Sequence, residues 1–273
     1  MQPEGDGATA RTETALGAIL RLASAAPMTV HCLGTGSAGA GADRTTTMLA
    51  VEAAGHTVLV DCGGDAVQRL LASGLDPVAL DAVILTHEHP DHLSGYPLLV
   101  EKLWLRGRRD PIPAYGPAST LAKARALFAI YETAGWTHVP ERVFHEVPLD
   151  PGTEVARLGN LVISATPVDH PVPTIGLRFE AGGAVFAYSC DTAPSPHVVA
   201  LSRSADLLIH EGTASLAGVH SSPEEAAQVA AEAGVGRLVL IHAPETPGPL
   251  DGARAIFPEV VWAEDGDRFE VGD

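Results

Sequence analysis

Cysteine and aromatic residues are both scarce in this chain of 273 residues. Three cysteines, Cys32, Cys62 and Cys190, cannot build a disulfide framework, and their odd number favours a reducing compartment. Aromatic residues make up 5% of the chain, so alanine, valine and leucine must fill most of the core. Hydrophobic residues at 46% and charged residues at 19% are typical of a globular protein and exclude a disordered chain.

A long hydrophobic run is also missing. No stretch reaches the about 18 apolar residues that a membrane-spanning helix needs. The apolar run at 15–26 is interrupted by Arg21 and follows acidic rather than basic residues, which argues against a signal peptide. We therefore expect a cytoplasmic protein, with 1–27 as a loose N-terminal extension and 28–273 as a single domain.

Basic residues are few. Lysine and arginine total 17 against 34 aspartate and glutamate residues, which gives a formal charge of −17. A field of that sign repels polyanions and counts against non-specific binding of nucleic acid. One local exception, Lys102, Arg106, Arg108 and Arg109 beside Trp104, fits either a nucleic-acid contact or the solvated end of a helix.

Strand and helix patterns alternate along the chain without a repeat or a dividing linker. Strands are predicted at 29–33, 47–52, 57–61, 82–86, 161–166, 174–180, 184–189, 206–210 and 237–241. Helices are predicted at 66–72, 98–105, 121–133 and 223–233, the last with Ser221 or Ser222 as its N-cap and Gly234 as its stop. Hairpins mixed with crossover helices predict one α/β (α+β) unit, in which two sheets pack together with helices outside.

A glycine-rich loop follows the first predicted strand. Gly34, Gly36 and Gly39 have the spacing of a dinucleotide-binding loop, and Asp61 lies at a suitable distance. In such a loop a helix must begin, so that its N-terminus faces the pyrophosphate. Here the chain continues with a β-branched stretch at 44–48, which favours a strand. We interpret the loop as a tight connection near the active site.

The segment 86–92, Thr-His-Glu-His-Pro-Asp-His, is the most informative in the sequence. Residues two apart in an extended segment point the same way, so His87 and His89 can converge on one ion. A turn at Pro90 then directs Asp91 and His92 toward a second ion. Imidazoles with a carboxylate suit Zn²⁺, with Mn²⁺ or Fe as alternatives.

Two ions need more ligands than this segment supplies. His170, Asp191 and His242 each follow a predicted strand, at 163–168, 185–189 and 238–241 respectively. Strand ends of this kind deliver side chains to a common edge, so we expect these three residues to complete the metal centre.

The sequence resembles the metallo-β-lactamase superfamily and, within it, the ribonuclease Z-like branch, from about Thr29 to the C-terminus. The matching motifs are Val-Asp-Cys-Gly at 60–63, the histidine motif at 87–92, His-Glu-Gly-Thr at 210–213, and His-Ser-Ser-Pro-Glu-Glu-Ala-Ala at 220–227. The resemblance implies an αβ/βα four-layer sandwich of two mixed sheets flanked by helices.

The same resemblance implies roles for single residues. His87, His89 and His170 would bind one metal, and Asp91, His92 and His242 the other. Asp191 would bridge both together with a hydroxide, and Asp61 would steady the motif. His220 would assist the leaving group or hold the phosphate, oriented by Glu211. His210 is interpreted as a structural residue at a strand end, and the remaining histidines carry no motif. Cys190 should point away from Asp191 on an extended strand, so we assign it no role.

Together these residues predict a hydrolase with two divalent metal ions per chain, most simply Zn²⁺, that acts on phosphodiesters, RNA 3′ ends included. Hydrolysis of another ester, such as a lactone or an aryl sulfate, and a non-catalytic binding role remain as alternatives. The oligomeric state stays open, and a homodimer is compatible with the sequence.

Transfer RNA is a doubtful substrate. In ribonuclease Z a long flexible arm between the third histidine ligand and the bridging aspartate grips transfer RNA. Here 20 residues separate His170 from Asp191, and they read as two strands around a turn at 181–183. We therefore expect hydrolysis of small phosphodiesters with poor processing of precursor transfer RNA.

Overall fold

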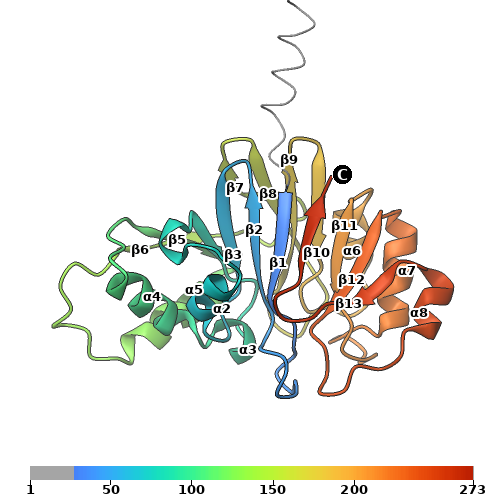
Figure 1. Cartoon of the computed structure of the whole chain (residues 1–273), viewed down its shortest axis with the longest axis horizontal. Helices are drawn as coiled ribbons and strands as arrows, with labels where there is room; N and C mark the ends of the chain where they lie inside the picture. Colours follow the sequence, from blue (N-terminus) through green and yellow to red (C-terminus); the bar gives the residue numbers. More distant parts are fainter. Residues whose placement is uncertain (1–27, 273) are drawn as a thin grey trace, which may run out of the picture.

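Two seven-stranded sheets form the centre of the molecule, in a computed structural model that describes residues 28–272 (Figure 1). The first sheet has the order β14-β1-β2-β3-β4-β5-β6 and the second β13-β12-β11-β10-β9-β8-β7. The predicted loose extension at 1–27 lies outside the described residues. Within the described part of the chain, no helix is long and apolar enough to cross a membrane.

The chain builds one sheet almost completely before it begins the other. The first sheet contains β1 (Met28–Gly34), β2 (Met48–Ala53), β3 (His56–Val60), β4 (Ala82–Ile84), β5 (Ile112–Gly116), β6 (Arg142–Glu146) and the C-terminal β14 (Arg268–Val271). The second contains β7 (Thr153–Leu158), β8 (Leu161–Pro167), β9 (Ile175–Ala181), β10 (Ala184–Tyr188), β11 (Leu207–Glu211), β12 (Arg237–Ile241) and β13 (Val260–Trp262).

Helices cover the outer face of each sheet, on the left and right of Figure 1. The first sheet carries α2 (Ala66–Ala72), the single turn α3 (Pro90–Leu93), α4 (Tyr96–Leu105) and α5 (Ala118–Ala129), with a 3₁₀ turn at Pro77–Ala79. The second carries α6 (Pro196–Ser202), α7 (Pro223–Ala233) and α8 (Asp251–Ile256). Helix, sheet, sheet and helix make four layers, so the predicted αβ/βα sandwich is confirmed.

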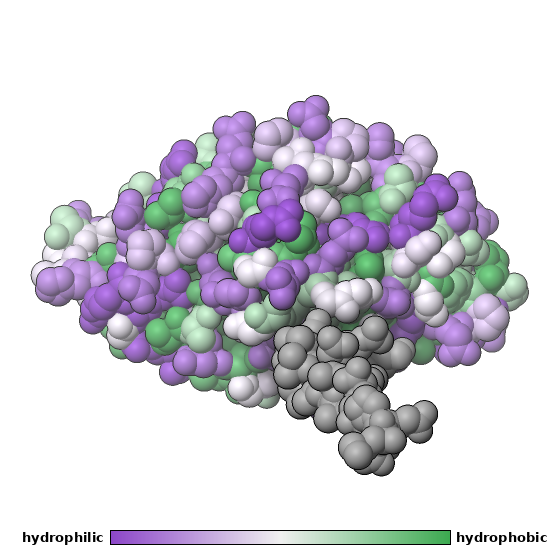
Figure 2. All heavy atoms as spheres, turned by 90° about the horizontal axis from the view of Figure 1, so that it is seen from above, coloured by the Kyte–Doolittle hydropathy of each residue, from purple (hydrophilic) through white to green (hydrophobic). Residues whose placement is uncertain are grey.

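Three hydrophobic clusters hold these layers together. The largest lies between the two sheets and includes Val30, Leu49, Phe179 and Phe186, all fully buried. The second fills the space between the first sheet and α2, α4 and α5, and the third lies between the second sheet and α6, α7 and α8. In Figure 2, hydrophilic and hydrophobic residues mix over the upper face, as expected for a surface that takes no part in this core.

Local capping explains why some helices end where the sequence predicts. In α7, Ser222 is the N-cap, its side chain accepts from the amide of Glu225, and Glu225 bonds back to the amide of Ser222. Gly234 ends this helix in the left-handed conformation, at φ 67°. Both predicted signals are thus present, since glycine pays no steric cost at positive φ.

The predicted basic cluster is dispersed by the fold. Arg108 is buried, and its guanidinium donates to the carbonyls of Val78, Leu80 and Pro111. Lys102 pairs with Asp65. Arg106 and Arg109 remain exposed at the end of α4, so the helix-end interpretation is the better one.

Candidate metal centre

The motif at 87–92 lies where β4 ends. Parallel strands β3, β4 and β5 run toward this edge, and α3 begins directly at Pro90. The single turn of α3 presents Asp91 and His92 to the inside of the molecule, as the sequence predicts. A loop packs so closely on this turn that a Cβ on Gly63 would lie 1.6 Å from the carbonyl oxygen of Asp91. Only glycine fits at that position.

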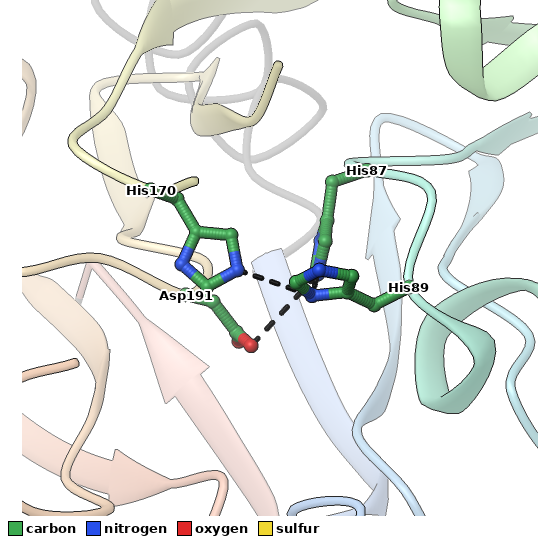
Figure 3. Close-up of side chains that lie close together, drawn as sticks. All are labelled: His87, His89, His170 and Asp191. Carbon is green, nitrogen blue, oxygen red and sulfur yellow. Dashed lines mark hydrogen bonds and ion pairs between the residues drawn. The ribbon is translucent and has the colours of Figure 1, made fainter. Parts of the chain in front are cut away.

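Three ring nitrogens and a carboxylate oxygen meet in a first group (Figure 3). Nε2 of His87 and Nε2 of His170 each lie 3.1 Å from Nδ1 of His89. Oδ2 of Asp191 lies 3.8 Å from Nε2 of His87. Two nitrogens bound tetrahedrally to one zinc ion at about 2.0–2.1 Å lie about 3.3 Å apart, so this spacing is close to that of a zinc site.

A second group shares one atom with the first. Oδ2 of Asp191 lies 3.2 Å from Nε2 of His242 and 3.5 Å from Nε2 of His92. Oδ2 of Asp91 lies 3.4 Å and 3.6 Å from the same two nitrogens. One carboxylate oxygen therefore belongs to two adjacent sets of potential ligand atoms, and all seven predicted ligands are brought together.

Two buried polar atoms in this centre have no hydrogen-bond partner, Nε2 of His92 and Oδ1 of Asp191. Buried polar groups normally find a partner. Burial alone would lower the pKa of His92, but the carboxylates of Asp191 and Asp61 hold it well above its usual value. Burial alone would raise the pKa of Asp191, but His242 and His92 hold it well below its usual range. Such a set of lone pairs and negative charge fits divalent metal ions.

Asp61 fixes the orientation of one ligand from behind. Oδ2 of Asp61 accepts from Nδ1 of His92 at 2.8 Å, so the lone pair of His92 Nε2 faces the centre. Asp61 also accepts the amide of Thr86 at 2.8 Å and the hydroxyl of Thr86 at 2.7 Å. The proposed steadying role of Asp61 therefore has a physical basis in three hydrogen bonds.

His170 and His242 are oriented in a similar manner. His170 donates from Nδ1 to the carbonyl of Val219 at 2.9 Å. The hydroxyl of Thr213 donates to the carbonyl of His242 and accepts from Nδ1 of that ring, both at 2.7 Å. In each ring Nδ1 carries the proton, which leaves Nε2 as the atom that can bind metal.

Cys190 corrects the sequence interpretation. The side chain of Cys190 was expected to point away from the site. Its φ is 56°, so the alternation of side chains along an extended strand does not hold at this residue. The buried thiol instead lies 3.0 Å from the hydroxyl of Thr86 and 3.6 Å from Nδ1 of His87. Thr86, Thr213 and Cys190 are thus neighbours of the ligands that sequence reasoning did not single out.

Strained backbone marks the same place. Asp61, Cys190 and His242 have φ between 55° and 60°, in the left-handed region that side chains other than glycine rarely adopt. Each follows a strand of the parallel part of a sheet. Strain of this kind persists where surrounding contacts demand it and clusters at functional sites.

His220 lies beside the second group of ligand atoms. One of its ring nitrogens is within 4.8 Å of ligand atoms of Asp191 and His242. Nδ1 of His220 lies 2.8 Å from Oε1 of the fully buried Glu211, which also accepts the amides of Thr192 and Ser221. Burial alone would lower the pKa of His220, but the hydrogen bond and the charge of Glu211 outweigh it and raise the pKa.

The glycine loop has no helix at its end. Residue Gly36 forms bridges to Thr46 and Ala243, and the chain then enters β2. Ala243 follows His242, so the loop borders the metal centre. This confirms the interpretation as a connection near the site rather than a nucleotide-binding loop.

Comparison with known proteins assigns the family. The sequence profile of the β-lactamase superfamily domain matches residues 56–243. Ribonuclease Z of Mycobacterium marinum is 32% identical, and the match covers 89% of this chain and 95% of that protein. Ribonuclease Z of Methanosarcina acetivorans is 28% identical over 88% of this chain and 96% of its own.

Solved structures agree. The metallo-β-lactamase fold protein YhfI from Bacillus subtilis superposes with a TM-score of 0.76 at 26% identity, over 89% of this chain and 99% of that chain. The short form of human tRNase Z superposes with a TM-score of 0.75 at 25% identity, over 90% of this chain and 100% of that chain. The chain therefore belongs to the metallo-β-lactamase superfamily, in its ribonuclease Z-like branch.

Proposed function

We propose that this metal-dependent hydrolase is a phosphodiesterase that holds two divalent ions, Zn²⁺ in preference to Mn²⁺ or Fe. One observation carries the proposal: Oδ2 of Asp191 is shared by two groups of ligand atoms, at 3.8 Å from Nε2 of His87 and 3.2 Å from Nε2 of His242. A bridging carboxylate between two sets of nitrogen ligands is the arrangement that two adjacent ions need.

The ligands divide into two sets in this proposal. His87, His89 and His170 would hold the first ion, and Asp91, His92 and His242 would hold the second. Asp191 would contribute to both sets. When bound, two such ions supply a hydroxide nucleophile at neutral pH and offset the negative charge that develops on the phosphate.

His220 supplies the proton for the leaving oxygen. Glu211 holds Nδ1 of His220 at 2.8 Å, so the other nitrogen, Nε2, is free to donate toward the substrate. Glu211 is itself fixed by backbone amides, which keeps the ring in one orientation. A phosphodiester needs this step because its leaving group is an alkoxide, and the curated relatives named ribonuclease Z support that substrate class.

The three cysteines are free and buried, which supports the predicted reducing, cytoplasmic compartment.

The names of the relatives suggest RNA as the substrate class. Without a partner, this chain should accept short phosphodiesters.

A panel of esters tests the proposal. We expect zinc-loaded protein to hydrolyse bis-p-nitrophenyl phosphate at least about tenfold faster than p-nitrophenyl phosphate, p-nitrophenyl sulfate or a lactone. Chelated protein is the control for metal dependence. Faster turnover of the lactone or the sulfate would replace the phosphodiesterase assignment, and inactivity on every ester would favour a binding role.

A further inference from the structure

A groove of about 480 Å³ lies against the metal motif, between α3 and α5. His89, whose Nδ1 lies within the first ligand group, also lines this groove. The single turn of α3 presents Asp91 and His92 to the metal centre, whereas Pro90 and Leu93 line the groove. His89 therefore lies between the metal centre and the groove, so a group attached to a phosphate at the centre is close to the groove.

The walls of the groove are apolar. Its aliphatic and proline lining consists of Pro90, Leu93, Ala126, Leu127 and Ile130. Ile130 is 74% exposed at the edge of this apolar lining. A volume of this size is within the range of sites for small molecules.

The charge at the rim does not fit a phosphate. Lys123 lines the groove, but its ammonium group pairs with Glu88, the residue between the first two histidines of the motif. This ion pair sets a negative charge beside the ammonium group, so the two charges offset each other. The groove thus offers apolar surface and no free cation among the described residues that line it.

We propose that this groove binds an aromatic or other planar apolar group that is joined to the phosphorus atom held at the metal centre. The proposal rests on the proposed function, because it assigns the second substituent of a phosphodiester to a position beside His89. Such a contact compensates for the overall charge of −17, which works against the binding of anionic substrates.

Two alanines on one helix give a matched test. Ala126 is exposed and lines the groove, whereas Ala118 is exposed at the start of α5, two turns away and outside the groove. Ala126→Phe places a phenyl ring in the groove, and Ala118→Phe adds the same side chain away from it. We expect Ala126→Phe to raise KM for bis-p-nitrophenyl phosphate about tenfold with kcat within twofold. KM for methyl p-nitrophenyl phosphate should stay unchanged, and Ala118→Phe should behave as wild type.

Binding without turnover separates this proposal from the proposed function. Phenylphosphonate and methylphosphonate can be titrated by calorimetry into the zinc-loaded chain. We expect the phenyl compound to bind at least about tenfold more tightly, and Ala126→Phe to abolish this preference. If the protein hydrolyses diesters but binds both phosphonates equally well, the proposed role of the groove is wrong and the phosphodiesterase assignment stands. If it prefers the phenyl compound but hydrolyses no diester, the phosphodiesterase assignment is wrong and the role of the groove stands. Undetectable binding of both phosphonates would contradict the proposed role of the groove. A dimer that Ala126→Phe converts to monomers in sedimentation would also contradict it, because a second copy of the chain would then occupy the groove.

Discussion

The hydroxyl of Thr86 lies 2.7 Å from Oδ2 of Asp61, and this contact connects the two halves of the metal centre. A carboxylate can only accept, so Thr86 donates its single hydroxyl proton to Asp61. Its oxygen is then an acceptor for Nδ1 of His87, at 3.2 Å. Asp61 therefore orients His92 directly and His87 through Thr86, and these rings belong to different proposed ions.

Removal of that hydroxyl should weaken metal binding. Thr86→Val leaves Nδ1 of His87 without its acceptor, and we expect roughly 10–100-fold weaker binding at the His87 ion. Chelator competition followed by elemental analysis measures it. Thr86→Ser keeps the hydroxyl and should restore the affinity, and circular dichroism checks that both variants fold. Wild-type affinity in Thr86→Val would show that the relay through Thr86 does not matter.

Chemistry and metal binding should separate in two variants. His220 is not among the seven proposed ligands, so His220→Ala should retain both ions while kcat for a diester with an alkoxide leaving group falls roughly 10²–10⁴-fold. Asp191→Ala should instead lose metal, because it removes the shared oxygen. Elemental analysis and turnover on the same preparations distinguish the two. If His220→Ala loses metal while Asp191→Ala keeps it, the proposed roles are reversed.

Metal content should approach two equivalents per chain, and affinity should fall in acid. The carboxylates that raise the pKa of His92 keep a proton on that ring in the metal-free protein. A metal ion must displace this proton, so affinity rises with pH and drops by about tenfold per pH unit below the raised pKa of His92 for each proton released. Chelator competition between pH 5.5 and 8 gives the slope. A content near zero after loading, or a flat pH profile, would contradict the proposed ligand set.

Precursor transfer RNA should be a poor substrate. The segment between His170 and Asp191 contains the hairpin of β9 and β10, paired from Ala181 and Ala184 onward, and no long arm. We expect turnover of bis-p-nitrophenyl phosphate together with weak trimming of a precursor 3′ trailer. The native oligomer should be used in this assay, since a partner subunit can supply contacts. Efficient, site-specific trimming by the pure protein would refute this prediction.

Elements whose ends are marked by capping residues agree well with the sequence-based predictions. The helix Pro223–Ala233 has a capping box and a terminal glycine, and Ala66–Ala72 begins after the N-cap Asp65. The helix predicted at 121–133 instead spans Ala118–Ala129, because a helical period alone does not fix the ends. Strands β5 and β6 and helix α6 were not predicted at all, since short elements with mixed polarity depend on their packing partners.

The proposed metal ligands could be located from the sequence because they are chemically distinctive residues at strand ends. The residues that contact these ligands could not be predicted in this way. Cys190 contacts His87 at a position where φ is 56°, and the alternation rule for extended strands fails at such a residue. The burial of Arg108 has a similar cause, since two of the carbonyls that bind it, those of Val78 and Leu80, come from residues about 30 positions earlier.

The metal centre draws its side chains from both sheets, between His87 at the end of β4 and His242 at the end of β12. No part of the chain that emerges early in synthesis contains a complete site, and the ring of ligands closes only when the two sheets have met. Contacts this distant in sequence form late, after the entropy of closing long loops has been overcome. Metal ions should therefore do little to speed folding and act mainly on the finished protein, where they oppose unfolding by mass action. The folding rate should then be the same with and without metal in the refolding buffer. The metal-loaded protein should unfold more slowly than the metal-free protein.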